Sequence, residues 1–190
     1  MSLPIYVYGN EVLREEAKNL DINNLDIRKE LDELIPQMFA TMEQADGVGL
    51  AAPQIGRSIK LLVVDGTVLA EDMPELKEFK KVMINPQVLW ESEETVEYSE
   101  GCLSVPDIHA DVVRSEKIRV KYINANYQEV TEEFSGFGCR MVQHELDHLK
   151  GILFTDKISP IRKKLIQGKL NNIVQGKIRT SYRVIKKNKK

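Results

Sequence analysis

The sequence has no hydrophobic run long enough to cross a membrane as a helix. No stretch approaches about 18 consecutive apolar residues, although 42% of the 190 residues are hydrophobic. The opening segment, MSLPIYVYGNEVLREE, contains neither the basic nor the apolar part of a secretory signal. We therefore expect a soluble globular protein of the cytoplasm that makes no contact with a membrane.

Cysteine and histidine are both scarce. The chain has two cysteines, Cys102 and Cys139, and three histidines. Without an export signal, a disulfide between the two cysteines is not expected, because the cytoplasm keeps thiols reduced. Either both cysteines are free thiols, or one of them is a metal ligand and the other is a free thiol.

Acidic residues are absent after Asp156. Residues 157–190 contain 12 of the 27 basic residues and no Asp or Glu, so the preceding part of the chain holds 15 basic and all 29 acidic residues. This asymmetry predicts either an arm that binds a polyanion or a solvated tail. We expect one folded domain over residues 1–159, followed by a basic helix and tail over residues 160–190.

Hydrophobic periodicity predicts short strands between helices. An amphipathic helix is expected at residues 25–44, although Pro36 should kink or split it. A glycine-rich segment at residues 47–56 should form a tight loop. The expected strands lie at residues 59–65, 82–90, 94–99, 117–123 and 126–134, the last two forming a hairpin about Asn124 and Ala125.

Two further helices are expected, at residues 138–149 and 160–174, and residues 186–190 should be disordered. Strands grouped between helices indicate an α+β domain. We predict a mainly antiparallel sheet around the central helix 138–149, with one helix on its N-terminal side and one on its C-terminal side.

The helix at residues 138–149 carries a potential metal site. His144 and His148 are four residues apart and lie one turn apart on the same face, so both imidazoles can bind one ion. Glu145 follows the first histidine, where it can reach a water on the metal. The alternative is a surface helix with two solvated histidines.

A catalytic metal site of this kind needs a third protein ligand. Helical metallopeptidases take it from downstream, but Phe154 occupies that position and Asp156 is the only acidic residue beyond. We therefore expect an upstream ligand, either His109 or, preferably, Cys102, because the glycine before Cys102 permits a close backbone turn. Cys139 should be a packed thiol.

Three segments of the chain resemble peptide deformylases. They are GVGLAAPQ at residues 47–54, EGCLS at 100–104 and QHELDH at 143–148, and they occur in the order found in that family. The resemblance covers about residues 5–160. It implies an amide hydrolase that removes the formyl group from the N-terminal formyl-methionine of newly synthesised proteins.

The resemblance also implies a ligand set. The metal would be Fe²⁺, held by Cys102, His144 and His148 with water as the fourth ligand. The same donors are compatible with Zn²⁺, Ni²⁺ or Co²⁺. The metal-bound water would attack the formyl carbon with help from Glu145.

Attack on the formyl carbon places a negative charge on the formyl oxygen. The family resemblance implies that two donors stabilise this oxyanion, the side chain of Gln54 and the backbone N–H of Leu103. Met141 lies about one turn before His144 and Glu145. Met141 and Val48 are expected to border a slot for the substrate's methionine side chain. Gly49 should let an extended peptide approach closely. The alternative for these positions is ordinary packing.

Many family members have an arginine after the cysteine motif that helps hold the substrate backbone. This chain carries His109 in that region, and we expect His109 to replace the arginine. The basic C-terminal segment resembles the extension that some deformylases dock on ribosomal RNA, so nascent formyl-methionyl peptides and the ribosome are the expected partners.

Two other functions fit parts of the sequence. A general metallopeptidase would use the same helix, but the downstream ligand is missing. A non-enzymatic nucleic-acid binder would use the basic segment and a structural metal.

Overall fold

A five-stranded antiparallel sheet forms the centre of the fold in the computed structural model, which describes residues 2–187. Every neighbouring pair in this sheet is antiparallel. In spatial order its strands are β2 (Gly49–Ala51), β3 (Leu61–Asp65), β4 (Lys80–Glu91), β7 (Lys117–Ile123) and β8 (Glu129–Ser135).

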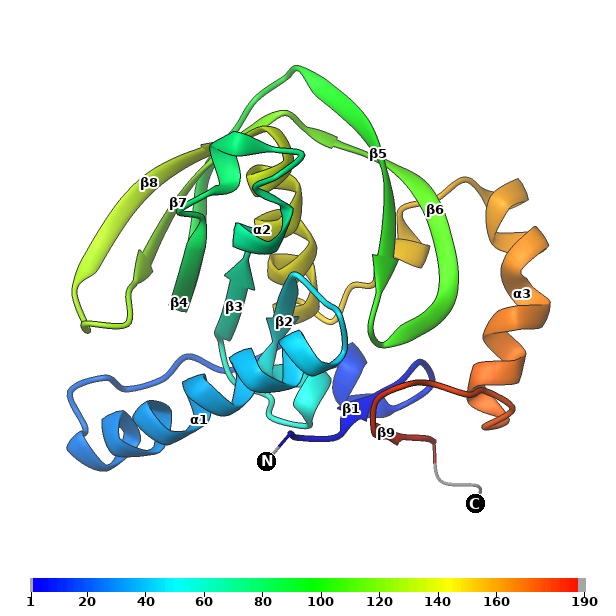
Figure 1. Cartoon of the computed structure of the whole chain (residues 1–190), viewed down its shortest axis with the longest axis horizontal. Helices are drawn as coiled ribbons and strands as arrows, with labels where there is room; N and C mark the ends of the chain where they lie inside the picture. The colour runs from blue at the N-terminus through cyan, green and yellow to red at the C-terminus, as the bar shows by residue number, and fades with distance from the viewer. Residues whose placement is uncertain (1, 188–190) are drawn as a thin grey trace.

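Two helices, α1 (Leu25–Gln44) and α2 (Gly136–Leu149), cover opposite faces of this sheet (Figure 1). Side chains alternate between the faces along a strand, and β3 shows this directly. Leu62 and Val64 pack in the cluster of α2, whereas their neighbours Leu61 and Val63 pack in the cluster of α1. The motif of His144, Glu145 and His148 therefore lies on a helix whose other face is fixed by the sheet.

A long hairpin, β5 (Thr95–Cys102) and β6 (Val105–Ser115), arches over the upper part of the molecule (Figure 1). Helix α3 (Pro160–Val174) packs against β6, with Leu170 and Ile173 buried beside strand residues. Strand β1 (Ile5–Tyr6) pairs in parallel with β9 (Val184–Ile185), which brings the two ends of the described chain together. Five short 3-10 helices complete the described elements: η1 (Glu11–Arg14), η2 (Ala52–Ile55), η3 (Thr67–Leu69), η4 (Pro74–Leu76) and η5 (Phe154–Asp156).

The predicted α+β class is confirmed, with an antiparallel sheet and three helices. Helix α1 is not split at Pro36. Pro36 lies on the exposed side of the helix, where water can meet the carbonyl that loses its N–H partner. No helix within residues 2–187 is both long and apolar enough to span a membrane.

Some local predictions are wrong. The segment 47–56 is not only a loop, because its middle forms the edge strand β2 and then η2. Strands β1, β6 and β9 were not expected. The disorder predicted for residues 186–190 falls partly on residues 188–190, which lie outside the described residues.

Candidate active site

Helix α2 turns its polar motif toward a cavity and its apolar face toward the sheet. Val142, Leu146 and Leu149 are buried in the cluster with β3, β7 and β8. This packing fixes the rotation of the helix about its axis. His144 and Glu145 line the cavity on the other side.

The ligand atoms of Cys102, His144 and His148 all lie within 4.8 Å of one another. Cys102 is the last residue of β5, and its Sγ lies 3.2 Å from His148 Nε2. The structure thus brings together the three residues that the sequence singles out as a ligand set. His109, the other upstream candidate, is not in this cluster and lines the cavity instead.

These three donors fit a divalent transition metal. One thiol sulfur and two imidazoles form a mixed sulfur and nitrogen set that suits Fe²⁺, Zn²⁺, Ni²⁺ or Co²⁺. His144 Nδ1 lies 2.8 Å from the carboxylate of Glu100. An outer carboxylate of this kind fixes the ring and leaves Nε2 for an ion.

Glu100 is the centre of a buried ionic network. Its carboxylate accepts hydrogen bonds from Arg114 at 2.6 and 2.9 Å and from Arg140 at 2.7 Å, besides its contact with His144. Burial alone would raise the pKa of Glu100, but the hydrogen bonds from Arg114 and His144 hold it well below its usual range. Arg114 also donates to Asp147 of α2 at 2.5 Å, so the network links β5, β6 and α2.

Glu145 is only 4% exposed, and its Oε2 has no hydrogen-bond partner among residues 2–187. Burial raises the pKa of Glu145 to about 7. A buried carboxyl group that lines a cavity and has a free oxygen can exchange a proton with a molecule bound there.

Gln54 and Leu103 both lie beside Cys102. The Oε1 atom of Gln54 accepts a hydrogen bond from the Ala51 N–H at 2.8 Å, which orients its Nε2 toward Cys102 Sγ, 3.6 Å away. Leu103 follows Cys102 in the turn between β5 and β6. The side-chain amide of Gln54 and the backbone of Leu103 therefore both lie next to the cysteine, and their oxyanion role stays a prediction of the family resemblance.

A cavity of about 430 Å³ opens onto these groups. The four residues expected to bind substrate, Val48, Gly49, His109 and Met141, all line it.

Sequence reasoning missed two sets of residues around the cavity. Glu100 lies within the EGCLS motif, and Arg140 lies one turn before His144. Their closeness to these motifs was a weak indication that they lie near the site. The C-terminal residues Arg179 to Tyr182 also line the cavity. No local pattern in the sequence indicates that they return there.

The family model for polypeptide deformylase matches residues 2–164. The chain belongs to this family. It is 43% identical to the peptide deformylase of Christiangramia forsetii, covering 97% of this chain and 95% of that protein. It is 44% identical to the peptide deformylase of Salinibacter ruber, covering 98% of this chain and 96% of that protein.

Solved deformylase structures share the fold. A peptide deformylase from Legionella pneumophila superposes with a TM-score of 0.79 at 34% identity, covering 93% of this chain and 98% of that one. A plant peptide deformylase gives a TM-score of 0.81 at 32% identity, covering 92% of this chain and 90% of that one. The predicted family and the predicted hydrolase class of this deformylase are confirmed.

Proposed function

We propose that this chain removes the formyl group from N-formylmethionyl peptides in the cytoplasm, with Glu145 as the acid and base. The observation that carries this proposal is the free Oε2 of a buried Glu145 beside three converging metal donors. The reaction consumes one water and releases formate and a free amino terminus.

Cys102, His144 and His148 would hold the metal. A divalent ion bound there would supply a Lewis acid that polarises the formyl oxygen and lowers the pKa of a water. Glu145 accepts the proton of the attacking water and delivers it to the nitrogen of the departing amine.

Gln54 and Leu103 stabilise the negative charge that develops on the formyl oxygen. The Ala51 N–H holds the Gln54 side chain beside Cys102. The Gln54 N–H₂ group, which donates to Cys102 Sγ and to the Ser104 hydroxyl, would exchange one of these contacts for the formyl oxygen. Removing one such donor typically lowers the rate by about 100-fold or more.

The cavity supports binding of an extended peptide that begins with methionine. Met141 and Val48 offer apolar surface for the methionine side chain. Strand β2 is at the edge of the sheet and pairs only with β3 within the described residues, so its other edge, which includes Gly49, can pair with the peptide backbone. His109 offers a ring nitrogen to a peptide carbonyl.

Formate release decides between this proposal and its alternatives. Wild-type protein should release formate from formyl-Met-Ala-Ser and leave unblocked Met-Ala-Ser intact. Glu145→Gln should keep its metal and lose hydrolysis, while Glu133→Gln on exposed β8 should change neither. Cleavage of the unblocked peptide would instead indicate a general metallopeptidase. Activity that persists in Glu145→Gln would refute the role of Glu145.

We also propose that residues 160–190 contact ribosomal RNA. Arg162 and Lys163 of α3 pair with Asp111 and Asp156. Lys164 and Lys169 are exposed and form no ion pair within residues 2–187. Their charges are therefore available to phosphates, and such contacts weaken as salt rises.

Charge reversal is a better test of docking than truncation, because α3 buries Leu170 and Ile173 against the domain. The double variant Lys164→Glu, Lys169→Glu should bind ribosomes at least about 10-fold more weakly at low salt and should show a shallower salt dependence. Its formate release from a free tripeptide should match that of the wild type. Unchanged ribosome affinity would contradict the docking proposal.

A further inference from the structure

The C-terminal segment that follows α3 forms part of the active-site cavity. Arg179, Thr180, Ser181 and Tyr182 line the same cavity as Glu145. Pairing of β9 with β1 directly follows this segment and anchors it to the domain. The segment is therefore both part of the basic C-terminal region and a wall of the site.

Tyr182 makes a specific contact from this wall. Its hydroxyl donates a hydrogen bond of 2.8 Å to the backbone carbonyl of Leu103. Its ring is half-buried and, like Leu103, packs against the α1 cluster. The hydroxyl is a donor at neutral pH, because the ordinary pKa of tyrosine is about 10 and burial raises the pKa of Tyr182 to about 12.

Leu103 lies in the turn that follows Cys102, so a hydrogen bond to its carbonyl constrains that turn. It and Ser104 are the two central residues of the turn between Cys102 and Val105. The Ser104 carbonyl is held by the Tyr8 N–H at 2.7 Å, and the Ser104 hydroxyl by Gln54 at 3.2 Å. The Leu103 carbonyl is held by Tyr182.

We infer that Tyr182 is a positioning residue for hydrolysis, which it promotes by fixing the peptide groups on either side of Leu103. Peptide groups are planar, so the direction of the Leu103 N–H depends on few dihedral angles once its carbonyl is fixed. An oxyanion donor is effective when it is held in place before the reaction. This inference rests on the proposed function, which makes the Leu103 N–H such a donor.

Tyr182→Phe tests the inference, because it removes the hydroxyl and keeps the ring that packs against the α1 cluster. Loss of one positioning hydrogen bond should lower kcat for formyl-Met-Ala-Ser about 3- to 10-fold and leave KM within about two-fold. The midpoint of thermal unfolding should fall by no more than about 4 °C, because one hydrogen bond contributes about 1 kcal/mol to the free energy of unfolding. The amide signal of Leu103 in the ¹H–¹⁵N spectrum of the full chain should shift.

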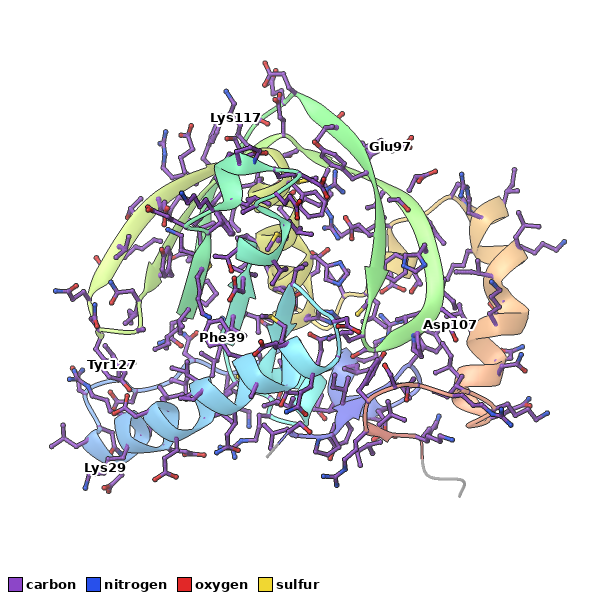
Figure 2. All side chains as sticks on the ribbon, in the orientation of Figure 1. Lys29, Phe39, Glu97, Asp107, Lys117 and Tyr127 are labelled. Carbon is purple, nitrogen blue, oxygen red and sulfur yellow. The ribbon has the colours of Figure 1, made fainter. Side chains whose placement is uncertain are left out.

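Tyr127→Phe is the matched control. The Tyr127 hydroxyl, which has one proton to donate, lies 2.9 Å from the Arg28 carbonyl and 2.6 Å from Asp32 Oδ1. Figure 2 shows Tyr127 at the left of the molecule and the cavity residue Asp107 to the right of its centre. This variant should leave kcat and the Leu103 amide signal unchanged.

Three outcomes would overturn the inference: an unchanged kcat in Tyr182→Phe, an unshifted Leu103 amide, or a loss of activity that appears only through KM or unfolding. Failure of the proposed function is distinguishable, because wild-type protein would then release no formate. The amide signal would still decide whether Tyr182 sets the Leu103 peptide groups.

Discussion

Gly49 leaves no room for a side chain beside Glu145. A Cβ atom at residue 49 would lie 2.8 Å from Glu145 Cδ and 2.9 Å from its Cγ. Because such contacts are too short, Gly49→Ala should displace the Glu145 carboxyl group. A displacement of this kind should lower kcat for formate release by about 10- to 100-fold. Overpacking should also lower the free energy of unfolding by about 1–3 kcal/mol.

Gly168→Ala is the control for this prediction. A Cβ atom at residue 168 of α3 would meet nothing within 4 Å. Alanine favours the helix over glycine by up to about 1 kcal/mol, so this variant should be equally active and slightly more stable. Equal kcat values for the two variants would contradict a close fit between Gly49 and Glu145.

Glu100→Gln should weaken both the fold and the metal site. The amide cannot replace a carboxylate that compensates Arg114 and Arg140 and also contacts His144. Leaving buried charges without a partner costs about 3–5 kcal/mol. Loss of the outer partner of a metal-binding histidine typically lowers metal affinity about 10- to 100-fold. Urea unfolding and competition with a chelator measure the two effects.

The exposed ion pair between Arg119 and Glu133 provides the comparison. Their side chains are 50% and 46% exposed. Exposed pairs contribute at most about 1 kcal/mol, so Glu133→Gln should barely change stability and should leave metal affinity unchanged. If the two variants bound metal equally well, Glu100 would have no role in holding His144.

Helix α2 could be predicted from sequence because its signals lie within one segment of the chain. The spacing of His144 and His148 defines one face of the helix, and the apolar residues Val142, Leu146 and Leu149 define the other. Cys102 lies in a short motif next to a glycine, and the structure does bring its sulfur to the two imidazoles. A helix or a ligand residue can be predicted from sequence when the residues that indicate it lie within one short segment.

Strand β6 was missed because its start has the chemistry of a turn. Pro106 and Asp107 are rare inside strands, and Asp107 has a φ of +60°. Arg114 also points inward, which breaks the expected alternation of apolar and polar residues. Its partner Glu100 lies on the neighbouring strand β5, so only strand pairing shows why a buried arginine is tolerated.

The ion pair of Asp156 with Arg14 should make stability depend on pH. Burial alone would raise the pKa of Asp156, but its hydrogen bond with Arg14 lowers it. A carboxylate whose pKa falls on folding stabilises the protein above its unfolded pKa of about 3.9 and loses this contribution as pH falls through the folded pKa.

Asp156→Asn should therefore lower the free energy of unfolding by up to about 1 kcal/mol at pH 7, because both side chains are partly exposed. The difference from wild type should shrink below about pH 4. Asp72→Asn, in the exposed segment between η3 and η4, is the control and should change the free energy of unfolding by no more than about 0.5 kcal/mol at pH 7. Urea unfolding at both pH values measures the effect, and a difference that grew in acid would contradict it.

The two cysteines should behave differently toward metal and thiol reagents. Cys102 lies in the ligand cluster, whereas Cys139 is 1% exposed in the core, where burial raises the pKa of its thiol to about 11. Cys102→Ser should lower bound metal per chain at least about 10-fold after anaerobic purification, and Cys139→Ala should not. In metal-free protein at pH 8, only variants that retain Cys102 should react rapidly with a thiol reagent, because a buried thiol forms little thiolate. Full metal content in Cys102→Ser would remove this residue from the ligand set.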